Sequence, residues 1–91
     1  MKIRYTKRAL RDLSHLELFL KAHSPRGASR VASRIRKRIN DLELFPYQGS
    51  PAKQGRRMLV VTQTPYLVIY RATDVEVQIL TIIHASQRRR S

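Results

Sequence analysis

A histidine and several basic side chains are predicted to lie in or beside the last strands of the chain. The basic residues are Lys53, Arg56, Arg57 and Arg71, and the histidine is His84. Cleavage of an RNA phosphodiester without a metal needs a base for the 2′-hydroxyl proton, a cation for the crowded phosphate and an acid for the leaving oxygen. Arginine or lysine can stabilise the phosphate, and histidine titrates close to neutral pH. These residue types therefore permit phosphodiester chemistry.

The second proton-transfer group that this chemistry needs is missing from the same region. Between Glu43 and Asp74 there is no carboxylate, and no tyrosine follows Tyr70. His84 is the only histidine on the sheet face that we expect to be open, and it could act as base or acid. A lone histidine at a strand end more often satisfies a backbone group or packs against its neighbours, so a structural role for His84 is favoured.

Positive charge is the dominant property of the composition. The 91 residues include 19 Lys and Arg but only 6 Asp and Glu, which gives a formal net charge of +13. Solubility alone asks for about 2–8 charges on a small domain. Such an excess attracts polyanions, and binding to nucleic acid or to an acidic protein should depend strongly on salt. A merely soluble basic protein is the alternative.

Composition also narrows the protein class. The hydrophobic fraction of 42% predicts a folded chain, and the length fits one domain over residues 1–91. There is no cysteine, and His15 and His23 are too far apart to suggest a metal pair, so no metal or cofactor is predicted. No run of about 18 apolar residues is present, and Met1–Tyr5 is charged. We therefore expect a cytoplasmic protein with no membrane association.

Two helices should position these residues after a short first strand over Lys2–Tyr5. Thr6 can cap a helix over residues 7–22, and Ser24 can cap a second helix that starts at Pro25 and reaches about Leu44. In the first helix, apolar residues at spacings of four, three and four form a core stripe: Ala9, Leu13, Leu16 and Leu20. Leu18 lies roughly opposite this stripe and should be exposed. The two helices are expected to form an antiparallel hairpin.

The second helix has one apolar and one basic face. Its predicted core residues are Ala28, Val31, Ala32, Ile35, Ile39 and Leu42, and its basic residues include Arg26, Arg30, Arg34 and Lys37. Like charges four residues apart each cost about 0.2–0.5 kcal/mol in an isolated helix. A solvated charged face is the default interpretation, but a sequence that tolerates this repulsion suggests an anionic partner.

After a loop over residues 45–55, three strands are predicted: Arg57–Val61, Tyr66–Arg71 and Val75–His84. Their short connections indicate an antiparallel meander. Strict alternation in the last strand would put Val77, Ile79, Thr81 and Ile83 on one face, and Gln78, Leu80, Ile82 and His84 on the other. The expected fold is therefore α+β with the order β-α-α-β-β-β, in two layers. The helical hairpin packs on one face of a small, mainly antiparallel sheet, and the other face is open.

Several segments together resemble the RelE/ParE toxin family of type II toxin–antitoxin systems, and the resemblance covers nearly the whole chain. The segments are Ala9–Leu13, Ile39–Leu42 followed by Pro46 and Gly49, Arg57–Leu59, Pro65–Arg71 and Ile79–His84. The resemblance implies the two-layer fold already expected and an acidic, ParD-like antitoxin in a hetero-oligomer. ParE-like members poison DNA gyrase and so block replication, whereas RelE-like members cut messenger RNA on the ribosome.

Pro65–Tyr70 and His84 look more like the ParE branch. That branch often ends with His, two residues and Arg, whereas this chain has Gln87 at the last position and its first tail arginine is Arg88. Because the second proton-transfer group is missing, we expect a toxin that binds gyrase or its DNA complex and breaks no bond. The alternative is a metal-independent endoribonuclease that acts on the ribosome and its message. A non-toxic basic binding module is the third class.

Site residues follow from these alternatives. A nuclease would use Arg57, His84, Lys53 and Arg71, and Arg57 corresponds to the strand arginine that contacts phosphate in the nuclease branch. Target binding is assigned to Arg57, His84, Arg88, Arg89 and Arg90, the last three in a tail over residues 85–91 that we expect to be flexible. Antitoxin binding is assigned to Leu18, Phe19, Arg30 and Arg34, with an amphipathic helix of the antitoxin lying against the first two.

Overall fold

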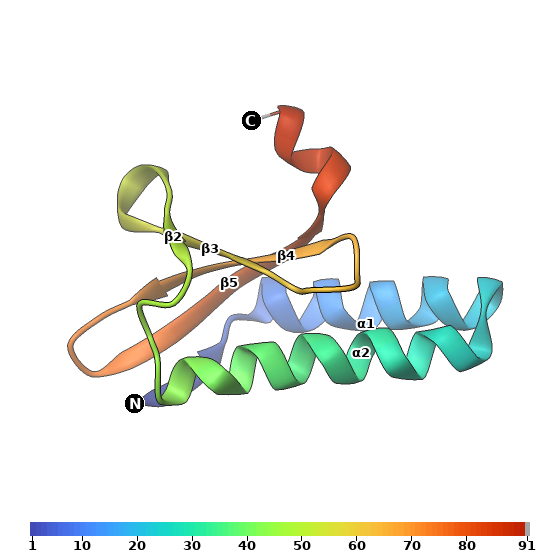
Figure 1. The fold of residues 1–91 in the computed structure, drawn as a ribbon, viewed down its shortest axis with the longest axis horizontal. Helices are drawn as coiled ribbons and strands as arrows, with labels where there is room; N and C mark the ends of the chain where they lie inside the picture. The colour runs from blue at the N-terminus through green and yellow to red at the C-terminus, as the bar shows by residue number, and fades with distance from the viewer. Residues whose placement is uncertain (91) are drawn as a thin grey trace.

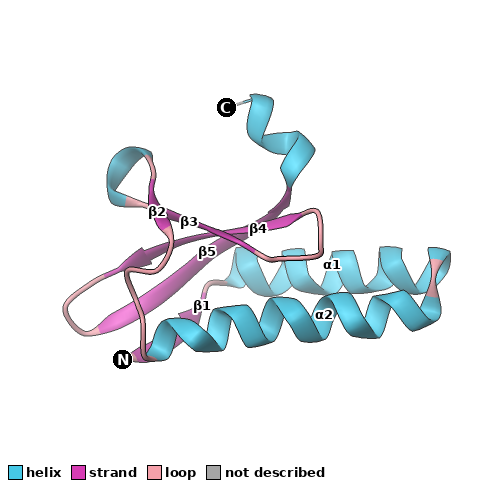
Figure 2. Ribbon diagram, in the orientation of Figure 1, coloured by secondary structure: helices cyan, strands magenta, loops and turns pink. Residues whose placement is uncertain are grey.

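Five strands form one mixed sheet in the order β1-β5-β4-β3-β2. The computed structural model describes the backbone of residues 1–90 and the side chains of residues 1–87. The strands are β1 (Lys2–Tyr5), β2 (Ser50–Pro51), β3 (Arg57–Val60), β4 (Tyr66–Ala72) and β5 (Glu76–His84). Only β1 and β5 pair in parallel, and the other pairs are antiparallel. Figure 2 shows the strands as one layer and the two long helices as another.

The helices are α1 (Lys7–His23) and α2 (Pro25–Asn40), with short 3-10 turns η1 (Asp41–Glu43), η2 (Lys53–Gly55) and η3 (Ala85–Arg90). Both predicted caps are present. The Thr6 hydroxyl accepts from the backbone N–H of Ala9 at 3.1 Å, and the Ser24 hydroxyl accepts from that of Gly27 at 3.3 Å. The second helix ends at Asn40 and not near Leu44 as expected, because the backbone continues as the 3-10 turn η1.

The helical hairpin covers one face of the sheet, as predicted (Figure 1). Residues from both layers are fully buried between them, among them Ile35, Ile39, Val68, Tyr70 and Ile79. Leu18 points away from this core and is 67% exposed, as its place on α1 predicts. On the other side of the sheet, η2 and η3 rise at its two ends (Figure 1). The α+β, two-layer fold expected from the sequence is therefore confirmed.

An extra residue in β5 overturns the predicted alternation of its side chains. Tyr70 pairs with Ile79 and the preceding Ile69 pairs with Thr81, so Leu80 has no partner in β4. Such a β-bulge shifts which side of the sheet the following residues face. The strict alternation expected from the sequence is therefore wrong beyond Ile79.

The bulge also moves His84. Its cross-strand partner is Tyr66, which faces the core together with Val68 and Tyr70 at alternate positions of β4. Paired residues lie on the same face of a sheet. The expectation that His84 lies on the open face is thus wrong, because the bulge places it on the helix side, at the end of the sheet.

Tyr70 anchors the loop that follows η1. Its buried hydroxyl donates to the carbonyl of Pro46 at 2.8 Å and accepts from the N–H of Gly49 at 2.8 Å. A Cβ atom on Gly49 would lie 2.7 Å from the Tyr70 ring, so only glycine fits there. Burial raises the pKa of the Tyr70 hydroxyl, which keeps it protonated and able to donate. The loop then leads into the two-residue strand β2, too short for the sequence pattern to predict.

Replacing Tyr70 with Phe should lower the free energy of unfolding by about 1–3 kcal/mol, because the Gly49 N–H and the Pro46 carbonyl lose their partner. Chemical denaturation of the purified protein measures this difference. The matched control is Tyr47→Phe: Tyr47 is 59% exposed and its hydroxyl has no hydrogen bond within residues 1–87, so its loss should change stability by less than about 0.5 kcal/mol. Equal stability of the two variants would contradict the anchoring role.

Candidate functional site

The cations proposed for catalysis lie on different faces of the sheet. Arg57 lies on the helix side of β3, where its Nη1 donates to the carbonyls of Tyr47 at 3.3 Å and Gly49 at 2.8 Å. Its guanidinium carbon also lies 5.0 Å from the centre of the Tyr47 ring. Arg57 therefore holds the same loop that Tyr70 anchors.

Arg71 and Lys53 lie on the opposite side. Arg71 follows Tyr70 in β4 and so points to the open face, where its Nη2 donates to the carbonyl of Gln54 at 3.1 Å. Lys53 is exposed in the same turn, η2. The structure thus brings these two cations to one end of the open face, without Arg57.

His84 lies at the other end of the sheet. Arg57 pairs with Tyr70, whereas His84 pairs with Tyr66, four residues away along β4. At about 3.3 Å per residue this is a separation of roughly 13 Å along the strand, before the width of the sheet is added. With the Arg57 guanidinium bound to the loop before β2, Arg57 and His84 therefore do not face a common site.

The His84 ring is held by its surroundings. Its Nδ1 accepts from the backbone N–H of Ser86 at 3.1 Å and lies 2.9 Å from the Ser86 hydroxyl. The ring also packs edge-on against Tyr66, with centroids 5.6 Å apart. These contacts hold the ring in place at the end of the strand.

A groove of about 460 Å³ runs between α1 and the last part of β5; we call it the α1–β5 groove. Its α1 side carries Arg8, Asp12, His15 and Phe19, and its other side includes Tyr66, His84 and Gln87. The four α1 residues recur at spacings of four, three and four. This polar and aromatic stripe beside the core stripe is the sequence signal that would have revealed the groove.

Asp12 fixes the wall of this groove. Strand β1 ends at Tyr5, opposite Ile79, so the next part of β5 has no strand on that side. There the Asp12 carboxylate accepts from the Thr81 hydroxyl at 2.5 Å and from the Ile82 N–H at 3.2 Å. A side chain of α1 thus replaces the missing strand at an edge that would otherwise leave a backbone donor unpaired.

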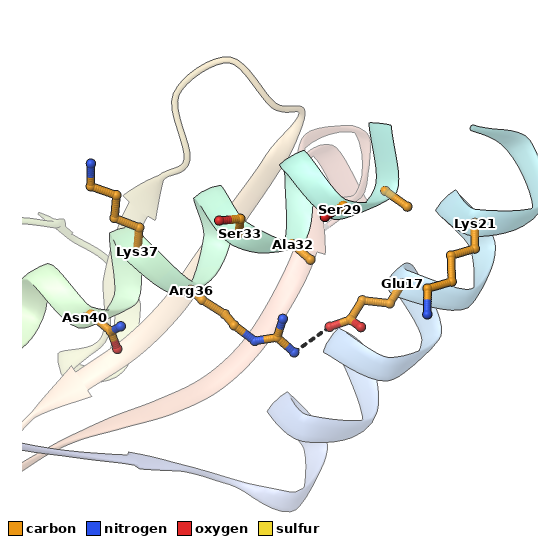
Figure 3. Close-up of a pocket in the computed structure, with 9 residues that line it drawn as sticks. Glu17, Lys21, Ser29, Ala32, Ser33, Arg36, Lys37 and Asn40 are labelled. Carbon is orange, nitrogen blue, oxygen red and sulfur yellow. Dashed lines mark hydrogen bonds and ion pairs between the residues drawn. The ribbon is translucent and has the colours of Figure 1, made fainter. Parts of the chain in front are cut away.

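A second hollow of about 530 Å³ lies between the two helices on their outer side; we call it the α1–α2 groove. Small side chains of α2, including Ala32 and Ser33, line it. Arg36 reaches across to Glu17 with 2.6 Å between Nη2 and Oε1, whereas Lys37 points away from α1 (Figure 3). This ion pair joins the two helices.

The few acidic side chains are mostly engaged within the fold. Besides Asp12, three carboxylates form ion pairs: Glu17 with Arg36, Asp41 with Arg38 and Glu76 with Arg4. Hydrogen bonds from the Gln78 amide and from Arg4 lower the pKa of the Glu76 carboxyl. The remaining surface is therefore strongly positive.

The residues assigned to antitoxin binding fall on two surfaces. Leu18 and Phe19 are 67% and 57% exposed on α1, and Phe19 stacks on His23 with ring centroids 4.2 Å apart. Phe19 lines the α1–β5 groove, on the flank of α1 that faces away from α2. Arg30 and Arg34 are exposed on α2. The structure does not bring the two pairs together.

The tail arginines Arg88, Arg89 and Arg90 continue η3, and their side chains lie outside the described residues, as does Ser91.

Within the described part of the chain, no group of three or more histidine or acidic side chains lies close enough to hold a metal ion. No helix in residues 1–90 combines the length and the apolar character that crossing a membrane would need.

Comparison with known proteins identifies relatives over nearly the whole chain. Residues 3–89 match the sequence model of the ParE toxin of the type II toxin–antitoxin system parDE. The Y4kP protein of Sinorhizobium fredii is 36% identical over 88 residues, which cover 96% of this chain and 91% of that protein. Toxin RelE2 of Caulobacter vibrioides is 35% identical over 83 residues, or 91% and 93% of the two chains.

Two solved structures are similar in fold. A chain of the chromosomal ParDE system of P. aeruginosa is 25% identical and superposes with a TM-score of 0.84, covering 92% of this chain and 95% of its own. A chain of the RelBE2 toxin–antitoxin complex of Mycobacterium tuberculosis is 27% identical with a TM-score of 0.62, covering 91% and 95%. The protein described here therefore belongs to the ParE toxin family and is a toxin of the ParE/RelE type from a type II toxin–antitoxin system.

Proposed function

We propose that this toxin binds DNA gyrase on DNA and stabilises the cleaved intermediate, and that a cognate antitoxin neutralises it. The observation that carries the proposal is the separation of His84 from the cations. Arg57 is bound to the loop before β2, Arg71 and Lys53 lie on the open face, and His84 lies at the far end. General acid–base cleavage needs these groups around one phosphate. Binding a target needs no such convergence.

A gyrase poison of this kind acts by differential affinity. It must bind the cleaved gyrase–DNA complex more tightly than the resealed complex, and the ratio of the two affinities sets the shift in population. The net charge of +13 favours encounter with a target that carries DNA. The higher TM-score with the ParDE chain than with the RelBE2 chain also supports gyrase.

Of the residues assigned to target binding, His84 and the tail arginines follow one another at the end of β5. The proposal therefore centres target contact on this end of the molecule. Arg57 of β3 lies beside the other end of β4, where its side chain donates hydrogen bonds to the loop over residues 46–49. Its contribution to target binding would be to hold that loop in place.

Adding the purified toxin to gyrase and supercoiled plasmid should increase the amount of DNA that is released as a linear form after detergent and protease treatment. Stabilisation of the cleaved intermediate produces this result, because detergent traps broken strands. In parallel, the toxin is added to a translating ribosome extract, and the message is mapped by primer extension. Cut message together with unchanged plasmid would overturn the proposal in favour of the ribosome-dependent nuclease.

The variant His84→Gln should reduce the activity by less than about tenfold, because the His84 ring is a contact and not a proton-transfer group. Loss of a general base or acid costs about 100- to 10,000-fold. Dose–response curves in the gyrase assay and in the ribosome extract measure the change. Circular dichroism of the variant checks the fold, and the conservative variant Gln87→Asn serves as a control for a neighbouring contact, since the Gln87 side chain accepts from the His84 N–H. A loss of 100-fold or more specific to His84 would indicate catalysis.

The antitoxin is proposed to cover the exposed apolar side chains of α1. Leu18 and Phe19 are adjacent in sequence and both are exposed, and the Phe19 side chain also lines the α1–β5 groove. An amphipathic helix of the antitoxin could place its apolar face on them, with acidic residues facing the surrounding cations. The family relationship supports an antitoxin partner, since both solved relatives are toxin–antitoxin systems.

The double variant Leu18→Asp and Phe19→Asp should weaken the complex with the cognate antitoxin at least tenfold. Burial of one large apolar side chain contributes about 1.5–3 kcal/mol, and 1.4 kcal/mol is a factor of ten in affinity. Isothermal titration calorimetry measures the change. Leu10→Asp is the matched control, because Leu10 is 51% exposed on the same helix but does not line the α1–β5 groove. An unchanged affinity of the double variant would show that the antitoxin binds a different surface of the toxin.

A further inference from the structure

Four cations form a straight ridge on the outer face of α2: Arg26, Arg30, Arg34 and Lys37. Their spacings of four, four and three residues place them on one strip of the helix, about 17 Å long at 1.5 Å per residue. All four are exposed. We call this strip the α2 ridge.

Nothing within the described residues neutralises the α2 ridge. The ion pairs of α2 use the neighbouring cations, Arg36 with Glu17 and Arg38 with Asp41, which flank the strip. No carboxylate of residues 1–87 lies within 4.0 Å of a ridge cation. Because like charges three and four residues apart repel, the ridge destabilises the helix that carries it. Its charge is therefore available to an anionic partner outside the fold.

The chemistry of the ridge favours a polyanion over a protein helix. Protein interfaces are built around buried apolar anchors. The large apolar side chains exposed on the helices are Leu10, Leu18 and Phe19, and all three belong to α1. α2 exposes cations, serines and Asn40 but no large apolar residue. An acidic protein segment would find charge on the ridge but no anchor, whereas a phosphate backbone needs only charge.

The absence of aromatic residues from α2 selects a duplex over a single strand. Proteins that bind single-stranded nucleic acid stack its bases on aromatic side chains. α2 contains none, and the exposed aromatic residues Phe19, Phe45 and Tyr47 lie outside it. In a duplex the bases are already stacked, and the phosphates face outward.

We propose that the α2 ridge binds the phosphate backbone of duplex DNA, without reading its sequence, as a binding activity that the toxin has independently of gyrase. A shallow groove of about 340 Å³ runs from the ridge to the turn between β3 and β4. Arg34, Lys37, Arg38 and Asp41 line one side of this groove, and Val61, Thr62 and Gln63 line the other. Arg38 is paired with Asp41, so the free charge on this groove comes from the ridge cations Arg34 and Lys37, and Thr62 and Gln63 add neutral polar groups. The choice of DNA over duplex RNA rests on the proposed function.

The α2 ridge and the proposed antitoxin surface lie on different flanks of the hairpin. Phe19 lines the α1–β5 groove, whereas Glu17 and Lys21 line the α1–α2 groove and separate Phe19 from α2. An antitoxin helix seated on Phe19 would therefore leave the ridge accessible.

The test compares two full-length triple variants with the same change in net charge. One removes ridge cations (Arg30→Gln, Arg34→Gln, Lys37→Gln), and the other removes exposed cations of α1 (Lys7→Gln, Arg11→Gln, Lys21→Gln). Glutamine suits helices almost as well as arginine and lysine. Fluorescence anisotropy with a labelled 20-base-pair DNA duplex of arbitrary sequence, in about 50–200 mM salt without gyrase, gives the affinity and its salt slope.

The ridge variant should bind the duplex at least tenfold more weakly at 100 mM salt, and its log–log salt slope should fall by about 2.7, which is 0.9 for each lost phosphate contact. The α1 variant should lose less than threefold. Equal losses in both variants would mean that net charge alone acts, and would overturn the proposal. The proposal would also be overturned if the ridge variant kept its DNA affinity but bound the antitoxin more weakly. The ridge would then be a contact surface for a protein.

Two further arms separate this inference from the proposed function. A duplex RNA of the same sequence is titrated under the same conditions and should bind no more tightly than the DNA; tighter binding of the RNA would overturn the choice of DNA. The assay contains no gyrase, so a failure of the gyrase experiment leaves a positive DNA result standing, and the reverse also holds. Thermal unfolding of both variants shows whether they fold, and the ridge variant should melt no lower than the wild type because repulsion is removed.

Discussion

The bond from Asp12 to β5 decides how the two layers of this protein meet. Where β1 stops, its carboxylate accepts from Thr81 and from the backbone of Ile82, so that α1 takes the position of a further strand at the sheet edge. With α1 fixed there, the hairpin can cover only one face. The α1–β5 groove, the open opposite face and the outward position of α2 all follow from that docking. The residue that creates the groove is thus also part of its wall.

Much of the fold could be predicted from the sequence because its helices are strongly patterned. The spacing of Ala9, Leu13 and Leu16 predicted the buried side of α1, and Thr6 and Ser24 predicted where the helices begin. The details of the sheet could not be predicted in the same way. A bulge at Leu80 leaves no mark in a run of β-branched and aliphatic residues, and Ser50–Pro51 is held as a strand by the loop that Tyr70 anchors.

The candidate site was less accessible to sequence reasoning because it depends on which residues face each other. The residue types for phosphate chemistry are present, yet Arg57, Arg71 and His84 are separated by faces and ends of the sheet. Conversely, the spacing of Arg8, Asp12, His15 and Phe19 shows that they share one flank of α1, but it does not show that this flank faces the end of β5. What the structure adds is that the large exposed apolar side chains of the hairpin lie on α1, whereas the outer face of α2 carries a row of cations and no large apolar side chain.

The bulge in β5 also gives the sheet a simple means of changing what its terminal part displays. Because neighbours in a strand face opposite ways, loss of the bulge with Leu80 paired to Ile69 in place of Thr81 would turn over every later side chain, and Ile83 would replace His84 opposite Tyr66. The following turn, η3, would then leave the sheet in a different direction. A one-residue shift in the pairing of β5 would thus change the surface near the C-terminus with no substitution there.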